Sequence, residues 1–223
     1  MDIKRIYEER YNEVSDYLQL LKFVDDLATT ETWSGKKYDK SIITYQPQRD
    51  MQKILRANTY LLMYNLVEST FAMMIEYVQT HINDEKKPLL NFIPEIRKIC
   101  AKSCFKISED AIEHMASNKP IYIDDWKLSY SGNVTMQSIK SFLGTIKCAP
   151  KTTLNEKDVE ASLEKIKQTR NCLAHGNMSF ADKGTSITYD AAKEDFEKAT
   201  QYLREMLSNL ERYVQNTEYL AKP

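Results

Sequence analysis

Hydrophobic residues recur at helical spacing along most of the chain. Between residues 3 and 28 the apolar side chains fall on one face, which predicts an amphipathic helix. A longer pattern runs from about Gln48 to Ile82. Its centre, Tyr60 to Val78, is apolar nearly all round, and this predicts a helix buried among other helices. A closing amphipathic helix is expected from about Ala191 to Tyr219.

Shorter patterns lie between these long ones. Further helices are expected over residues 88–101, 108–117, 135–147 and from Asn155 toward His175. Residues 29–46 are expected to form a loop, because Trp33-Ser34-Gly35 and Pro47 interrupt any period. Residues 121–130 alternate weakly and predict a small hairpin or an ordered loop, within an irregular insertion near 119–134. A short extended piece is expected over 186–189.

Composition agrees with a helical fold. The 223 residues include 5 glycines and 6 prolines, and 28% are charged, which favours helices over sheets. The length suits one well-cored domain. We therefore predict an all-α helical bundle with a small irregular or hairpin insertion, forming a single domain over residues 1–223.

Charge and hydropathy limit the expected binding partners and cellular compartment of the protein. The formal net charge is −1, so no global basic surplus indicates nucleic-acid binding, and any RNA contact is expected to be local. The start of the chain leads straight into a charged helix rather than an apolar export signal. No stretch of 18 apolar residues indicates a membrane span. We expect a cytoplasmic protein without a membrane partner.

Cysteines and histidines give no pattern typical of a metal site. Cys100 and Cys104 are one helical turn apart, a spacing that could hold a metal, but no CxxC pair or matching histidine pair accompanies them. Free, partly buried thiols are the favoured interpretation. His81 and His114 are expected to have structural roles. We predict no metal and no cofactor.

The chemistry gathers in the segment Arg170-Asn171-Cys172-Leu173-Ala174-His175-Gly176. Asn171 and His175 are four apart and share one face of a helix, which Gly176 is suited to end. Histidine exchanges protons near neutral pH, and arginine holds phosphate through a planar fork of donors. The set therefore suits a phosphodiester. Alternatively, the arginine and histidine cap carbonyls or pair with a carboxylate at a helix end.

This segment, Arg-Asn-x-x-x-His followed by glycine, resembles the motif of HEPN domains, a superfamily of helical proteins with many ribonuclease toxins. The resemblance extends beyond the motif and covers roughly Lys4 to Leu220. Three other stretches carry it, together with the closing helix: Leu55–Glu68, which resembles the long second helix of one HEPN branch, the turn Ser131–Val134, and Asn177–Phe180.

The resemblance implies a metal-independent endoribonuclease, the toxin of a toxin–antitoxin or anti-phage defence system, with an antitoxin protein as a possible partner. It implies that the ribose 2′-OH attacks the adjacent phosphate, that His175 handles protons, that Arg170 stabilises the phosphate charge, and that Asn171 fixes their geometry. It also implies a homodimer, in which two motifs meet at one site. The apolar stripes of the first and last helices, which include tyrosines, favour such a dimer as well.

One carboxylate is a candidate for a supporting role. Glu68 interrupts the apolar surface of the long helix, and a buried carboxylate costs several kcal/mol unless it is paired. Arg170 is the candidate partner; otherwise Glu68 faces water or pairs with another cation. The competing function is a non-catalytic HEPN module that binds nucleotide, RNA or a protein. A nuclease needs His175 exposed in a cleft that faces its dimer mate, whereas a binding module allows His175 to be buried and satisfied.

Overall fold

The computed structural model describes residues 2–27, 33–45, 49–104, 120–121, 123 and 133–222, without the side chains of residues 33, 45 and 101–104. The predicted helix over 108–117, the predicted hairpin over 121–130 apart from residues 121 and 123, His114 and the side chain of Cys104 lie outside this part. The described residues are mainly helical, which confirms the all-α prediction. They divide into two compact units.

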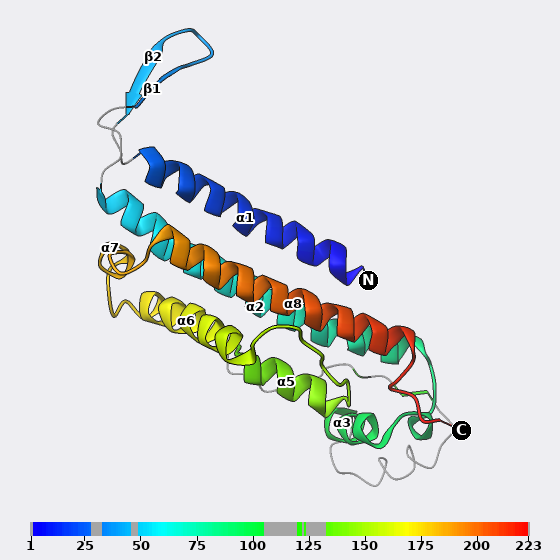
Figure 1. Ribbon diagram of the computed structural model, residues 1–223. Helices are drawn as coiled ribbons and strands as arrows, with labels where there is room; N and C mark the ends of the chain where they lie inside the picture. The colour runs from blue at the N-terminus through cyan, green and yellow to red at the C-terminus, as the bar shows by residue number, and fades with distance from the viewer. Residues whose placement is uncertain are drawn as a thin grey trace. The chain divides into compact units, whose positions relative to one another are not determined.

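The motif unit consists of residues 5–67 and 157–200. It contains most of α1 (Ile3–Leu27), the first part of α2 (Arg49–Asp84), nearly all of α6 (Glu156–Ala174), α7 (Phe180–Gly184) and the first part of α8 (Tyr189–Gln215). In this unit α2 and α8 lie side by side between α1 and α6 (Figure 1).

The tyrosines of α1 contact other helices within the motif unit. The Tyr7 hydroxyl donates to the Thr200 carbonyl on α8 over 3.0 Å, and the Tyr11 ring stacks on Phe196 at 5.1 Å between centroids. The Tyr17 hydroxyl donates to the Leu55 carbonyl on α2. These contacts give the aromatic stripe a partner within the chain. They remove the stripe as a separate argument for a dimer.

A close approach of two backbones fixes where α7 lies in the motif unit. A Cβ atom added at Gly184 would lie 1.9 Å from the Lys53 carbonyl oxygen on α2. No side chain fits at that distance, so glycine is required for α7 to pack on the start of α2. The same segment corrects one prediction. Residues 186–189 are not extended, because residues 185 and 186 form a turn and α8 already begins at Tyr189.

A second correction concerns the predicted loop over residues 29–46. Within it, β1 (Trp33–Lys36) and β2 (Ile42–Tyr45) pair antiparallel, with Trp33 opposite Tyr45 and Lys36 opposite Ile42. The Asp39 side chain accepts from the Ser41 amide over 2.9 Å and stabilises the connecting turn, while Lys40 adopts a φ of 66°. The β-branched and aromatic residues of β2 suit a strand.

The terminal unit consists of residues 1–4, 68–156 and 201–223. It contains the rest of α2 and α8, the 3-10 turn η1 (Leu89–Asn91), α3 (Pro94–Cys104) and α5 (Met136–Thr145). The single helix expected over 88–101 was wrong, since η1 ends before Pro94 and α3 begins there. The Tyr213 hydroxyl donates to the Ile146 carbonyl over 2.7 Å and fastens α8 to the end of α5.

Candidate active site at the end of helix α6

The end of α6 is built by its own sequence. Gly176 has a φ of +68°, a conformation that glycine adopts without steric cost. Its amide donates to the Leu173 carbonyl, and the Asn177 amide donates to the Cys172 carbonyl, each over 3.1 Å. Together these bonds form the double closure typical of a glycine-terminated helix. His175 therefore lies just after the last helical residue, Ala174, rather than inside the last turn.

His175 is exposed, and no described residue accepts from or donates to its imidazole ring. The residue lies at the C-terminal end of α6. Its main-chain amide donates to the Asn171 carbonyl over 3.1 Å, which holds the residue in place. The imidazole is thus accessible to a ligand.

Arg170 is half-buried on the same helix and has two well-defined contacts. One guanidinium nitrogen donates to the Asn171 side-chain oxygen over 3.0 Å. The guanidinium carbon lies 4.5 Å from the centre of the Tyr64 ring on α2. Tyr64 is only 2% exposed, so the ring is a fixed surface against which the cation rests. A cation over an aromatic face at this distance gains about 0.5–2 kcal/mol, depending on how far it is desolvated.

Lys165, another cation on α6, has different contacts from those of Arg170. Lys165 also lies over a ring of α2, with its ammonium 5.6 Å from the centre of Tyr60. Its charge is balanced, because the Asp195 carboxylate on α8 accepts from Lys165 over 2.7 Å and from the Tyr60 hydroxyl over 2.6 Å. Burial, followed by this bond to Asp195, raises the pKa of Tyr60 far above its usual range. The phenol therefore stays protonated as a structural donor.

The comparison of the two cations indicates which one is available to a ligand. Lys165 belongs to a closed ion pair, whereas Arg170 forms no ion pair with any described residue. An arginine positioned by an amide and a ring, with its charge unbalanced, is suited to hold an anion. Arg170 and Asn171 lie near the C-terminal end of α6 and His175 directly follows the helix, and the catalytic roles of all three stay predictions.

Sequence reasoning missed Tyr64 as the support of Arg170. A tyrosine in an apolar helix gives no local signal of such a role, because the contact depends on how α6 packs on α2. Glu68, one turn further along α2, is half-buried and belongs to the terminal unit. Its pairing with Arg170 stays a prediction. Among the described thiols, Cys100 and Cys148 are buried and Cys172 is half-buried, and none of the three forms a disulfide.

Two features are absent from the described part of the chain. It holds no group of three or more histidine, cysteine, aspartate or glutamate side chains placed to bind a metal ion. Within the same residues, no helix has both the length and the apolar character needed to cross a membrane.

A helical fold that presents Arg-Asn-x-x-x-His at the closed end of a helix defines a protein of the HEPN superfamily. The chain belongs to the MAE_28990-like HEPN family, whose family model matches residues 3–219. The match confirms the resemblance seen in the sequence and spans residues of both units. Comparisons with curated proteins and with solved structures gave no match.

Proposed function

We propose that this HEPN protein is a metal-independent endoribonuclease and that residues 1–223 form one HEPN domain. One observation carries the proposal: Arg170, which has no carboxylate partner in the described chain, and the exposed His175 lie at the same helix end. A cation without a counter-ion and an accessible proton carrier are two of the groups that phosphodiester cleavage by the ribose 2′-OH uses.

The proposed reaction needs no external reactant. The 2′-oxygen loses its proton to an imidazole and forms a bond to phosphorus, and the bond from phosphorus to the 5′-oxygen breaks. The leaving 5′-oxygen takes up a proton, so the products are a 2′,3′-cyclic phosphate and a 5′-hydroxyl. Arg170 stabilises the negative charge that grows on the phosphate oxygens, and Asn171 orients the guanidinium through its bond to Arg170.

A homodimer completes this mechanism. The reaction needs one group to accept a proton and another to donate one, whereas each chain offers a single His175 at the motif. Two motifs that face each other would supply an acid, a base and two cations. We therefore expect a dimer in light scattering at micromolar concentration. A monomer, or a dimer with the motifs on opposite outer faces, would contradict this arrangement.

The biological role that we propose is that of a cytoplasmic toxin in a toxin–antitoxin or anti-phage system, restrained by an antitoxin protein. The test is to induce the wild type and His175→Ala in bacteria and to compare growth and RNA integrity. His81→Ala is a matched control, because His81 bonds to the Tyr77 carbonyl within α2 and has no proposed role in cleavage. Only the wild type and His81→Ala should stop growth and fragment RNA.

Purified variants rank the motif residues. Loss of general acid–base help at His175→Ala should slow cleavage about a hundred- to ten-thousand-fold, and Arg170→Ala should be comparably severe. Arg170→Lys should rescue little, because an ammonium does not reproduce the planar fork. Asn171→Ala should be milder if it only orients Arg170. Unfolding curves must accompany the rates. Full activity in His175→Ala, or loss only through unfolding, would refute the catalytic role.

A non-catalytic module that binds nucleotide, RNA or a protein is the second candidate. The observation that favours it is the imidazole of His175, which no described residue orients, whereas catalytic histidines are commonly held by a third group. RNA binding that His175→Ala leaves unchanged, without cleavage by the wild type, would favour this alternative.

A further inference from the structure

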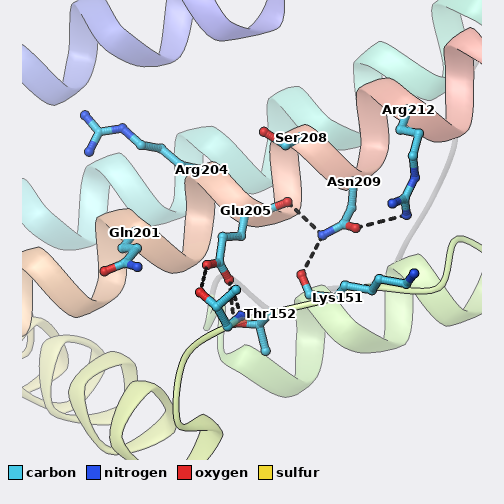
Figure 2. Close-up of a pocket in the computed structure, with 9 residues that line it drawn as sticks. Lys151, Thr152, Gln201, Arg204, Glu205, Ser208, Asn209 and Arg212 are labelled. Carbon is cyan, nitrogen blue, oxygen red and sulfur yellow. Dashed lines mark hydrogen bonds between the residues drawn. The ribbon is translucent and has the colours of Figure 1, made fainter.

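A hollow with charged side chains in its lining belongs to the terminal unit, away in sequence from the motif. It has a volume of about 480 Å³, and one of its walls is a stripe of α8 whose members recur every three or four residues. The other wall is the segment that precedes α6. The lining residues are Lys151, Thr152, Thr153, Gln201, Arg204, Glu205, Ser208, Asn209 and Arg212. Figure 2 shows the two walls, with Glu205 and Asn209 reaching from α8 to the segment that precedes α6.

The two walls are fastened together by side chains of α8. The Glu205 carboxylate accepts from the hydroxyls of Thr152 and Thr153 and from the Thr153 amide (Figure 2). Asn209, which is 6% exposed, donates to the Lys151 carbonyl and to the Glu205 carbonyl, each over 2.8 Å. The shape of the hollow is therefore set before any ligand arrives, which lowers the entropic cost of binding.

The lining carries an excess of positive charge. Lys151, Arg204 and Arg212 are cations, and Glu205 is the one carboxylate among the lining residues. Hydrogen bonds from the two threonines already satisfy that carboxylate, and together they lower the pKa of Glu205 although burial acts to raise it. The negative charge of Glu205 thus holds the segment with Thr152 and Thr153 against α8. Lys151 is exposed and forms no ion pair with a described residue.

Neutral donors complete the hollow. Ser208 and Gln201 are exposed on the same stripe of α8 and can donate to a ligand through a hydroxyl and an amide. Arg212 is oriented by a bond from its guanidinium to the Asn209 side-chain oxygen over 3.1 Å. Cations with flanking neutral donors match the oxygens of a phosphate group.

We propose that this hollow is a second binding site, which takes phosphate esters. The shared chemistry is a phosphate monoester or diester, supplied either by the backbone of an RNA strand or by a mononucleotide. RNA as the source of the phosphate rests on the proposed ribonuclease function. In that case the hollow would hold a phosphate of the RNA substrate other than the one that is cleaved. A mononucleotide does not depend on that function.

The test measures binding without cleavage. The His175→Ala protein of residues 1–223 is titrated with a labelled single-stranded RNA whose riboses are all 2′-O-methylated, so that no attacking hydroxyl is present. A second arm uses adenosine monophosphate. The variant Lys151→Ala with Arg204→Ala removes two cations from the hollow. The control Lys98→Ala with Lys222→Ala removes two exposed cations of the same unit that do not line the hollow.

The salt dependence of binding is the readout. Each phosphate contact with a single strand contributes about 0.7 to the slope of log K against log salt, so the hollow variant should lose roughly 1.4 from that slope. The control pair should keep the wild-type slope. Loss of adenosine monophosphate binding alone in the hollow variant would support the site and identify a mononucleotide as the source. Wild-type binding of both ligands by the hollow variant would overturn the proposal.

Two further measurements keep the outcomes separate. Ser208→Asp adds a negative charge at an exposed position and should weaken phosphate binding without disturbing the fastening bonds of Glu205 and Asn209. Unchanged binding by a folded Ser208→Asp protein would count against the hollow. Cleavage is assayed separately in the His175 wild-type background. Absence of cleavage would refute the nuclease and leave the binding result intact, and absence of any binding change would refute the hollow alone.

Discussion

Replacing the ring under Arg170 tests whether the position of this cation matters for the reaction. Tyr64→Leu removes the aromatic face that lies 4.5 Å from the guanidinium, whereas Tyr64→Phe keeps it. Because Arg170 is half-buried, the lost interaction is about 0.5–2 kcal/mol. If all of it is lost from the transition state, kcat/KM falls about 2- to 30-fold, since 1.36 kcal/mol corresponds to tenfold. Tyr64→Phe should cleave nearly as the wild type does.

The assay is single-turnover cleavage of a short labelled RNA, with thermal unfolding of each variant. Tyr64 is 2% exposed, so its replacement by leucine should also destabilise the fold, on the order of 1–3 kcal/mol. Rates must be compared at a temperature where every variant is folded. Under that condition a purely structural role of Tyr64 leaves the rate of the folded protein unchanged.

A double-mutant cycle separates action through Arg170 from other effects. Tyr64→Leu should slow cleavage in the wild type but should have no further effect in an Arg170→Ala background, because the cation that the ring positions is already gone. Wild-type rates for a folded Tyr64→Leu protein would refute the reasoning. So would an equal slowing with and without Arg170.

The other predictions concern metals, stability and thiols. Cleavage should survive a chelator, since histidines are only three and no carboxylate cluster accompanies His175 in the sequence. Asp195→Asn should destabilise the fold by about 1–3 kcal/mol, because the 7% exposed carboxylate accepts from two partners. The pKa of Glu205 in the folded protein lies below the ordinary value of 4.5. The stability that the Glu205 carboxylate contributes should therefore be fully present above pH 4.5 and lost as the pH falls through the folded pKa. Glu205→Gln should flatten this pH dependence of stability. Iodoacetamide should modify half-buried Cys172 before Cys148, whose pKa burial raises to about 11.

Each of these has an outcome that would contradict it. Complete loss of cleavage in EDTA, restored by a divalent ion, would move the protein to another mechanistic class. An unfolding temperature of Asp195→Asn equal to that of the wild type would show that its bonds add nothing. Parallel acid-unfolding curves for Glu205→Gln and the wild type would reject the linkage. Peptide mapping that finds Cys148 alkylated first in the folded protein would reject the order of the thiols.

The local structure of this protein follows from short-range sequence patterns. The stop at Gly176 needs only a residue that tolerates positive φ, and the start of α5 needs only the Thr135 side chain, which accepts from the Ser138 amide. The sequence predicted the stop at Gly176 and a helix over residues 135–147, because donor, acceptor and backbone angle lie within a few residues. The strands β1 and β2 were missed. Each has only four residues, too few for a period to distinguish a strand from a loop beside Gly35.

The sequence places Arg170, Asn171 and His175 at one helix end, but it does not show how the surroundings of Arg170 differ from those of Lys165. Lys165 and Arg170 are two basic residues on one helix, and nothing local distinguishes them. Asp195, which lies on α8, balances Lys165, and Tyr64 on α2 supports Arg170 without balancing its charge. The partners are 30 or more residues away along the chain. Only the packing of the helices decides which cation is neutralised.

The hollow beside α8 depends on tertiary structure in the same way. Gln201, Arg204, Glu205 and Ser208 recur at helical spacing, and in the sequence they are indistinguishable from an ordinary solvated face. This face of α8 lines the hollow because Glu205 and Asn209 form hydrogen bonds to residues 151–153, which lie more than 50 residues earlier in the chain. The periodicity of apolar residues along a helix shows which side of the helix faces away from the core. It carries no information about which distant segment covers the other side, because that choice is made by contacts between side chains that meet only in the folded chain.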